Sequence, residues 1–349
     1  MKVLVSDFLF PLGHKKLNMY FIEILSNIAD QVIVTNIGGY YEKFTNNNII
    51  LNNIKIPKVL LRTKSPVFTR IRALFIFFQT KKLYKKTKSD IIFITAFDTV
   101  TMAFCSLANL RKLNMYLVHH NNVDELQSRI KILFFNLYKN NVRHLVLEHF
   151  IHERLETYFK YPNAKIFTIL HPVYQNEHIK LTKFKYHYVA LSNSNDEKLI
   201  KKIIDIEKKE MLFSKNEIRI IIKSKEYTYK NDYLTVFRGF IDKESYEDLI
   251  LNSINVLLLF PDSYKYRSSG TLIDAIGSGK QVVGTNIQLM RNLSIEYPNL
   301  IRTFLFLGDL ISLVKSDDEL FRLELENFMN SRSNSKVKFT LCEILKGGG

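Results

Sequence analysis

Short apolar runs rich in β-branched residues alternate with longer amphipathic segments from the beginning of the sequence. This alternation is typical of a parallel β-sheet whose strands are joined by crossover helices. The strand candidates of the first half are 2–6, 31–35, 54–56, 90–95, 114–118, 144–147 and 165–170. The helix candidates between them are 17–28, 66–86, 99–110 and 124–138. The pattern therefore predicts the α/β fold class.

A second series of the same kind begins at residue 188. Its strand candidates are 188–191, 217–223, 234–237, 255–260 and 280–284, and its helix candidates are 196–209, 245–252 and 271–277. A chain of 349 residues also exceeds what one hydrophobic core usually organises. We therefore predict two Rossmann-like domains, 1–175 and 176–349, which face each other across a cleft at the carboxyl ends of their strands.

The composition is that of a globular protein, with 46% hydrophobic and 24% charged residues. Two cysteines, Cys105 and Cys342, are too few for a disulfide framework or a cysteine-ligated metal site. No apolar stretch approaches the ~18 to 20 residues that span a bilayer. We expect a cytoplasmic protein without a signal peptide, a transmembrane helix, a metal or a resident cofactor.

The most informative stretch is 234–286. In it a strand is followed by R-G-F, an amphipathic helix, a strand ending in proline, a loop with S-S-G, and a helix carrying an acid before A-x-x-x-G-x-x-V-V. This order resembles the donor-binding domain of GT-B glycosyltransferases, particularly the large retaining family marked by two glutamates eight positions apart. The resemblance implies a metal-independent enzyme that uses a nucleotide sugar as its substrate.

The S-S-G loop has the chemistry of a phosphate site. Free backbone N–H groups and the helix dipole favour an anion where a loop enters a helix, at Ser268, Ser269, Gly270 and Thr271. Arg267 can offer a forked guanidinium to a pyrophosphate. Asp274 follows one turn later on the same helix face, and the resemblance implies that it binds the ribose. The alternative is an ordinary helix cap and turn.

The resemblance also assigns residues outside that loop. Arg238, Gly239 and Phe240 match the segment beside the nucleobase, and Lys223 ends a strand from which a cation can reach the diphosphate. Tyr266 stands where the family has its first glutamate, which leaves the stereochemistry open. Lys223 and Arg238 could equally be surface residues.

The first half carries the candidates for chemistry on the acceptor. His119 and His120 directly follow the strand 114–118, and the resemblance implies that a histidine there contacts the transferred sugar. Consecutive strand residues point to opposite faces, so at most one enters the cleft, while the other packs or caps a helix. Other acids and histidines near strand ends could act as the base of an inverting enzyme: Asp7, Asp98, Glu148 and His149. Gly13 is the single glycine of the segment 8–16, where the resemblance implies a glycine-rich loop.

The net charge of +16 is concentrated in the first half, where residues 1–174 hold 24 Lys and Arg against 11 Asp and Glu. Residues 58–88 contain ten basic residues, five aromatic residues and no acid. Basic residues beside an aromatic apolar face are typical of a helix that inserts among anionic lipid headgroups. The alternative is a core helix with a solvated basic end. Nucleic acid is not an expected partner, because no recognition motif accompanies the charge.

We therefore predict a glycosyltransferase that moves a sugar from a nucleotide-sugar donor to a saccharide or lipid-linked acceptor. A role in cell-envelope or surface polysaccharide biosynthesis, at the inner face of the cell membrane, would agree with the basic first half. Two alternatives stay open from the sequence. One is a nucleotide-sugar epimerase of related fold, and the other is a catalytically inactive scaffold.

Overall fold

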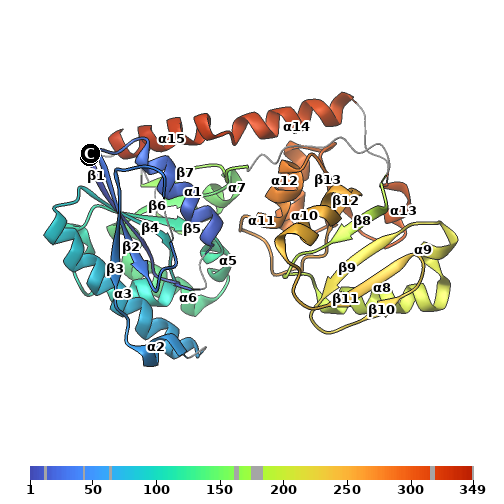
Figure 1. Cartoon of the computed structure of the whole chain (residues 1–349), viewed down its shortest axis with the longest axis horizontal. Coiled ribbons are helices and arrows are strands. Elements are labelled where there is room, and N and C mark those ends of the chain that lie inside the picture. Colours follow the sequence, from blue (N-terminus) through green and yellow to red (C-terminus); the bar gives the residue numbers. More distant parts are fainter. Residues whose placement is uncertain are drawn as a thin grey trace. The chain divides into compact units, whose positions relative to one another are not determined.

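The computed structural model describes residues 1–11, 14–41, 44–62, 65–160, 165–173, 184–314 and 319–347. The chain forms two compact units (Figure 1). The first unit contains Met1–His171, Tyr266–Ser268 and Asn334–Gly349, and the second contains Pro172–Lys265 and Ser269–Ser333. The expected division lay at 175/176, whereas the chain divides at 171/172 and its last helix returns to the first unit.

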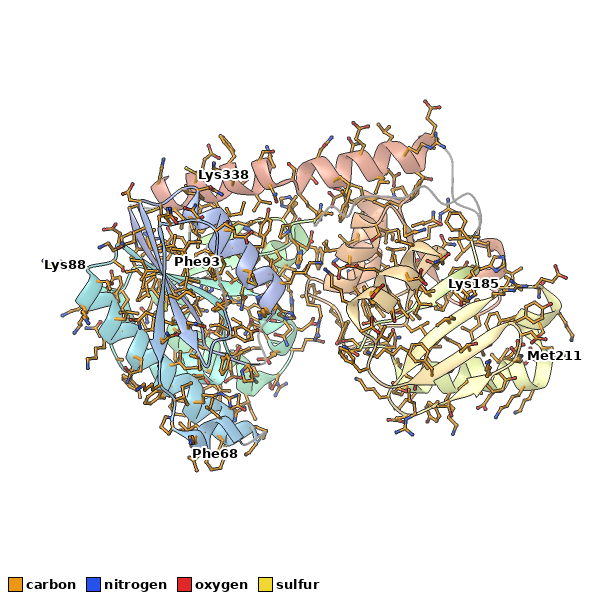
Figure 2. All side chains as sticks on the ribbon, viewed as in Figure 1. Phe68, Lys88, Phe93, Lys185, Met211 and Lys338 are labelled. Atoms are coloured by element: carbon orange, nitrogen blue, oxygen red, sulfur yellow. The ribbon has the colours of Figure 1, made fainter. Side chains whose placement is uncertain are left out.

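The first unit is built on a seven-stranded, fully parallel sheet of order β3-β2-β1-β4-β5-β6-β7. Its strands are β1 Lys2–Asp7, β2 Gln31–Ile37, β3 Ile49–Ile54, β4 Ile91–Ala96, β5 Met115–His119, β6 Arg143–Val146 and β7 Ile166–Thr168. The central strands are buried on both faces, which explains their unbroken apolar runs. Phe93 of β4 lies fully buried in this unit (Figure 2).

The helices of the first unit cover both faces of the sheet. They are α1 Lys15–Ser26, α2 Lys58–Arg62, α3 Pro66–Thr87, α4 Thr99–Ser106, α5 Asn122–Glu125, α6 Arg129–Tyr138, α7 His149–Glu156 and α15 Asn334–Gly347. Two 3₁₀ turns, Leu110–Lys112 and Lys139–Asn141, precede β5 and β6. Right-handed crossovers put α1 on one face and α3, α4 and α6 on the other, where all three share one core cluster with α7.

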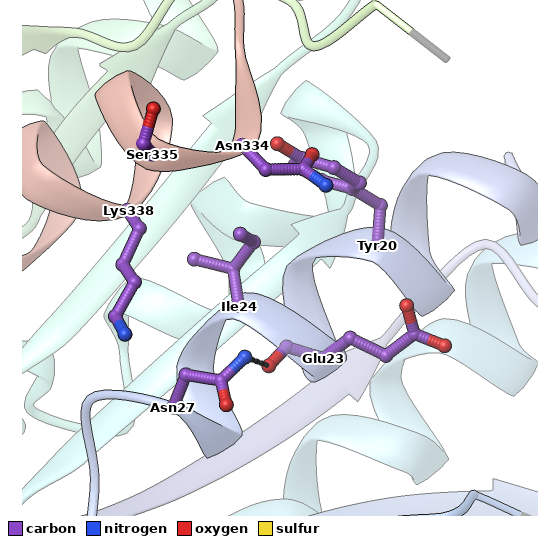
Figure 3. Close-up of a pocket in the computed structure, with 7 residues that line it drawn as sticks. All are labelled: Tyr20, Glu23, Ile24, Asn27, Asn334, Ser335 and Lys338. Carbon is purple, nitrogen blue, oxygen red and sulfur yellow. Dashed lines mark hydrogen bonds between the residues drawn. The ribbon is translucent and has the colours of Figure 1, made fainter. Parts of the chain in front are cut away.

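Helix α15 packs against α1, which explains why the C-terminal segment belongs to the first unit. The two helices enclose a cavity of about 200 Å³ (Figure 3). Tyr20, Glu23 and Ile24 line it from α1, and Asn334 and Lys338 line it from α15. The hydroxyl of Tyr116 on β5 donates to the Ile344 carbonyl at 3.3 Å and fastens α15 to the sheet.

The second unit repeats the plan with a sheet of order β10-β11-β9-β8-β12-β13-β14. Its strands are β8 Tyr186–Ala190, β9 Ile220–Ser224, β10 Tyr229–Lys230, β11 Leu234–Arg238, β12 Ser253–Leu258, β13 Gln281–Thr285 and β14 Ile301–Phe304. Its helices are α8 Glu197–Glu210, α9 Leu212–Lys215, α10 Lys243–Leu251, α11 Gly270–Gly277, α12 Gln288–Glu296, α13 Asp309–Ser312 and α14 Glu319–Ser331. Only β10 pairs antiparallel. The sheets confirm the predicted α/β class and the two Rossmann-like halves.

The strand order reverses between β1 and β4 in the first sheet and between β8 and β12 in the second. Open parallel sheets bind ligands at such switch points, outside the carboxyl ends of the strands. Functional side chains are therefore expected at these two sheet edges. Among the described helices, none combines the length and the apolar character that crossing a bilayer requires.

Candidate functional site

A large cavity opens at the carboxyl edge of the second sheet. It measures about 760 Å³ and is lined from β8, β9 and β11 by Asn193, Lys223, Ser224, Lys225, Arg238, Gly239 and Phe240. Four of the predicted donor residues therefore lie together: Lys223, Arg238, Gly239 and Phe240. Asn193, Ser224 and Lys225 were not predicted, because they lie just beyond the predicted strand ends.

Two buried or half-buried side chains shape this cavity. The Asn195 amide nitrogen donates to the Ala190 carbonyl at 3.1 Å and to the Lys223 carbonyl at 3.2 Å, which joins the ends of β8 and β9. Glu197, the first residue of α8, accepts from the Lys225 backbone N–H at 2.8 Å and from the Ser224 hydroxyl. The turn that presents Lys223 and Lys225 is thus fixed by α8.

The cavity is electropositive. Lys223, Lys225 and Arg238 line it, and no acid is among its described lining residues. Burial, with a smaller contribution from Lys225, lowers the pKa of Lys223. Gly239 has a φ of +122°, a conformation that L side chains rarely adopt, and Phe240 beside it is 91% exposed. The site can hold a polyanion against its cations and a flat ring against Phe240.

The remaining predicted donor residues of the second unit lie on helix α11 or at its N-cap. Ser269 is its N-cap and accepts from the Leu272 N–H at 3.3 Å, as the capping alternative predicts. Tyr246 of α10 lies beside this helix, since burial first and the Asp274 charge second raise the pKa of Tyr246, while a hydrogen bond from Thr271 lowers it. Thr271 and Asp274 therefore lie close to Tyr246 of α10, and Gly270 is the first residue of α11.

Tyr266, Arg267 and Ser268 belong to the first unit, not to the donor domain in which the sequence placed them. The Arg267 Nε atom donates to Asp124 Oδ2, and the Tyr266 N–H donates to Asp124 Oδ1 at 2.5 Å. The Arg154 guanidinium lies 5.1 Å from the centre of the Tyr266 ring. Arg267 is thus paired with a buried carboxylate through its Nε atom. Asp124 was missed because 143 residues separate the two partners.

One acid and two histidines lie at the carboxyl edge of the first sheet. Asp7, which ends β1, accepts from the Leu9 N–H at 2.8 Å and from the Asn18 amide at 2.9 Å, and burial raises its pKa to about 6. His14, at the start of α1, stacks on His120 with ring centroids 4.6 Å apart. His14 was not predicted, although its position in the first strand–helix loop could have indicated it.

The two consecutive histidines after β5 have different surroundings. The half-buried His120 has its Nε2 atom 2.7 Å from the Thr95 carbonyl, so Nε2 carries the proton. His119 is buried in the core, with Nε2 2.9 Å from His144 Nδ1, and His144 Nε2 lies 2.8 Å from the Lys139 carbonyl. Burial lowers the pKa of His120 to about 3 and that of His144 to about 4. This placement gives His119 a packing role and leaves His120 at the sheet edge.

The other two predicted acids lie at helix N-termini. Asp98 caps α4 by accepting from the Thr101 N–H at 2.8 Å, and it also lies 3.6 Å from Arg70 and 3.5 Å from Lys131. Glu148 is buried at the N-cap of α7. Gly13 lies outside the described residues. Within the described part of the chain, no cluster of three His, Cys, Asp or Glu residues could hold a metal.

No protein-family model and no curated protein matches the sequence. Solved structures, in contrast, match both units together. Arabidopsis thaliana UGT89C1 with UDP-L-rhamnose is 11% identical, with a TM-score of 0.62 over 99% of this chain and 98% of that chain. Anabaena HepE with UDP and glucose is 11% identical, with a TM-score of 0.61 over 99% of this chain and 100% of that chain.

A third similar structure is CalG4, the calicheamicin glycosyltransferase, which is 8% identical. Its TM-score is 0.55 over 99% of this chain and 97% of that chain. These neighbours have the GT-B architecture, so the chain has the GT-B glycosyltransferase fold. The predicted fold class is confirmed.

Proposed function

We propose that this protein is a glycosyltransferase that binds a nucleotide-sugar donor in its second unit. The observation that carries the proposal is the cationic cavity of Lys223, Lys225 and Arg238 at the carboxyl edge of a GT-B fold. Two structures of the same fold were solved with UDP-L-rhamnose and with UDP and glucose, which supports a nucleotide-sugar donor here.

In the proposed reaction, the second unit stabilises the departing nucleoside diphosphate. Fixed cations do this best where water is excluded, because they require no reorganisation when charge develops. Lys223, Lys225 and Arg238 would offset the diphosphate charge, and Phe240 would stack on the nucleobase. The free N–H groups at the start of α11 would add their partial positive charge. This set of groups can stabilise the leaving group without a metal.

The chemistry asked of the first unit is positioning of the acceptor hydroxyl and removal of its proton. His120 is neutral at pH 7, because its pKa is about 3. Its Nε2 proton is engaged by Thr95, so its Nδ1 atom is the one that can accept a hydrogen bond from the acceptor hydroxyl and orient it. His14 stacks on it and is exposed. We assign this pair to the acceptor, whose oxygen would bond to the anomeric carbon as the nucleoside diphosphate leaves.

The acceptor class we propose is a saccharide or a lipid-linked saccharide of cell-envelope or surface polysaccharide biosynthesis, reached from the cytoplasmic side of the membrane. The concentration of basic residues in the first half supports it, since such charge attracts anionic envelope components. The hexosyl type of the transferred sugar is part of the same proposal.

The first test is calorimetric titration with a panel of nucleoside diphosphates. Arg238→Gln and Lys223→Gln should each weaken the best-binding member by about 1.5 to 3 kcal/mol, the usual contribution of a hydrogen bond to a charged group. Lys230→Gln, an exposed lysine on β10 outside the cavity, is the matched control. Unchanged affinity in both cavity variants would remove the donor assignment.

The second test separates the proposal from its two alternatives. Incubation with a nucleotide sugar and a lipid-linked acceptor should give an elongated acceptor and free nucleoside diphosphate. An isomerised sugar with no change in the acceptor would identify an epimerase. Donor binding without any product, over a full acceptor panel, would identify an inactive scaffold.

A further inference from the structure

Helix α3 has an apolar surface on the side that faces away from the core. At about 100° per residue, Val67, Ile71, Phe78, Lys82 and Lys85 fall within one sector of about 60°. Val67 is 59% exposed and Phe78 is 56% exposed. The opposite side of the helix is also apolar and is buried in the core. The outward sector is therefore apolar in its first half and cationic in its second half, and Figure 2 labels Phe68 and Lys88 near its two ends.

The next two helices continue the apolar surface. Ile130, Leu133 and Leu137 recur at helical spacing on the exposed side of α6, and Leu107, just after α4, is 85% exposed. Phe104 of α4 is half exposed, and its ring lies 6.2 Å from that of Phe134 on α6. We call the outward apolar residues the α3–α4–α6 face: Val67, Ile71, Phe78, Phe104, Leu107, Ile130, Leu133 and Leu137.

The three helices are held together at the carboxyl edge of the sheet. Asp98, which follows β4 and caps α4, lies 3.6 Å from Arg70 of α3 and 3.5 Å from Lys131 of α6. The apolar face is thus a fixed platform and not three separate surfaces. Exposed apolar patches of this kind on a folded protein usually mark an interaction site.

Cations border the α3 part of the face, while Asp98 and Glu125 pair with Arg70 and Lys131 at the junction of the three helices. Lys82, Lys85 and Lys86 extend its α3 sector, and residues 58–88 contain no acid at all. At the amino edge of the sheet, where β5, β6 and β7 begin, a cavity of about 360 Å³ is lined by Arg111, Lys112, Arg143 and Lys165, together with Tyr84 near the C-terminus of α3 and with no described acid. The outward side of α3 therefore carries both apolar side chains and cations, and further cations lie at the amino edge of the sheet beyond its C-terminus.

We propose that the α3–α4–α6 face docks on an anionic lipid bilayer, with its leucine and phenylalanine side chains among the acyl chains and its cations among the headgroups. Charge complementarity selects this occupant, since lysine stems bury while their ammonium groups stay at the headgroup level. A second copy of the same face would bring the lysine borders of two chains together and is disfavoured by repulsion.

The docking surface extends the predicted membrane segment 58–88 to α4 and α6, which the sequence did not indicate. Arg70 and Lys131 place the first turns of α3 and α6 at Asp98, on the same sheet edge as His120. A chain docked in this way presents the acceptor edge close to the membrane surface. This step rests on the proposed function, and it selects the lipid-linked saccharide over the free saccharide as acceptor.

The test is co-sedimentation of the full chain with phosphatidylcholine vesicles that contain or lack phosphatidylglycerol. Binding should be stronger to the anionic vesicles and should fall as salt screens the charges. Leu107→Ser together with Leu133→Ser should weaken binding by about tenfold or more, because two exposed apolar groups no longer enter the bilayer. The matched control is Ile295→Ser with Leu305→Ser, two equally exposed apolar residues of the second unit, which should bind as the wild type does.

A second variant tests the charges by replacing Lys82, Lys85 and Lys86 with glutamine. Its affinity for anionic vesicles should be roughly 100-fold lower than that of the wild type. Lys198, Lys201 and Lys202, exposed on α8, are its control. Equal binding to both vesicle types, or equal losses in face and control variants, would overturn the proposal. So would a lipid-free dimer in sedimentation velocity that Leu107→Ser abolishes. Nucleoside diphosphate affinity, measured on the same variants, should not change, so failure of docking is distinguishable from failure of the donor assignment.

Discussion

His119 and His120 follow one another at the end of β5 and have opposite environments because side chains alternate along a strand. The sequence could predict that at most one would reach the sheet edge, but not which one. That depends on His144 and Lys139, which hold His119 in the core, and on Thr95, which holds His120 at the edge. These partners come from other strands and turns, so no local pattern indicates them.

His120→Ala and His14→Ala should lower turnover by about 100- to 10,000-fold while leaving nucleoside diphosphate affinity close to that of the wild type. A group that manages the acceptor proton acts in the transition state, whereas the donor is held by the other unit. His119→Ala should instead lower the free energy of unfolding, since it removes a buried ring and the hydrogen bond to His144. His187→Ala, on β8 of the second unit, supplies a control. Normal turnover in both His120→Ala and His14→Ala would exclude histidine chemistry at this edge.

Arg267 shows the limit of residue-by-residue inference. Its place before the S-S-G loop suggested a pyrophosphate partner, and the chemistry of a guanidinium supports that choice. The buried Asp124 offers a carboxylate to the same guanidinium: its Oδ2 atom accepts from Arg267 Nε, and its Oδ1 atom accepts from the Tyr266 N–H. Lys223 and Arg238 line one cavity because each lies at or next to the end of a parallel strand, a position that hydrophobic patterning predicts directly.

At the scale of elements, most central strands and long helices could be predicted, because their apolar patterns are long and unbroken. Strand β3 was displaced, with 54–56 expected and Ile49–Ile54 observed. It is an edge strand whose two asparagines and partial exposure hide the apolar pattern. The helix expected over 124–138 is interrupted, since Ser128 is extended and starts α6 anew. The two-residue β10 has too few residues to form a pattern.

Asp98 was predicted as a candidate base, and its environment is that of a helix cap. Asp98→Ala should lower the free energy of unfolding by about 0.5 to 2 kcal/mol, because the Thr101 N–H loses its acceptor. Asp98→Ser should recover most of this loss, since a serine hydroxyl also accepts from an N-terminal N–H. Urea denaturation of the two variants measures the difference. A serine variant that is stable but has lost its turnover would restore Asp98 as the base.

At the scale of the whole molecule, the first unit combines a basic surface with an interior that keeps three histidines uncharged. Burial lowers the pKa values of His119, His120 and His144, and it raises that of Asp7 from 3.8 to about 6. Asp7, His119 and His120 lie at the carboxyl ends of β1 and β5, and His144 near the start of β6 contacts His119. The stability of this unit is therefore coupled to proton uptake by the same region that we assign to the acceptor.

The free energy of unfolding should fall as the pH is lowered from about 7 to 4. Below the ordinary histidine pKa of 6.5, the unfolded chain takes up a proton at each of His119, His120 and His144. The folded chain takes up these protons only at lower pH, because burial lowers the pKa to about 3 for His120 and to about 4 for His144. Asp7 has the opposite effect on the free energy of unfolding between about pH 6 and pH 3.8, because in this range the folded chain binds the Asp7 proton and the unfolded chain does not. The unfolded chain thus binds up to three extra histidine protons, and the folded chain binds one extra proton at Asp7. The free energy of unfolding should therefore change by about 2 to 3 kcal/mol per pH unit at most. Urea denaturation at pH 7, 6 and 5 measures it. His119→Phe with His144→Phe should reduce the slope, and the exposed His149→Gln should not; equal stability at pH 7 and pH 5 would contradict the buried neutral histidines.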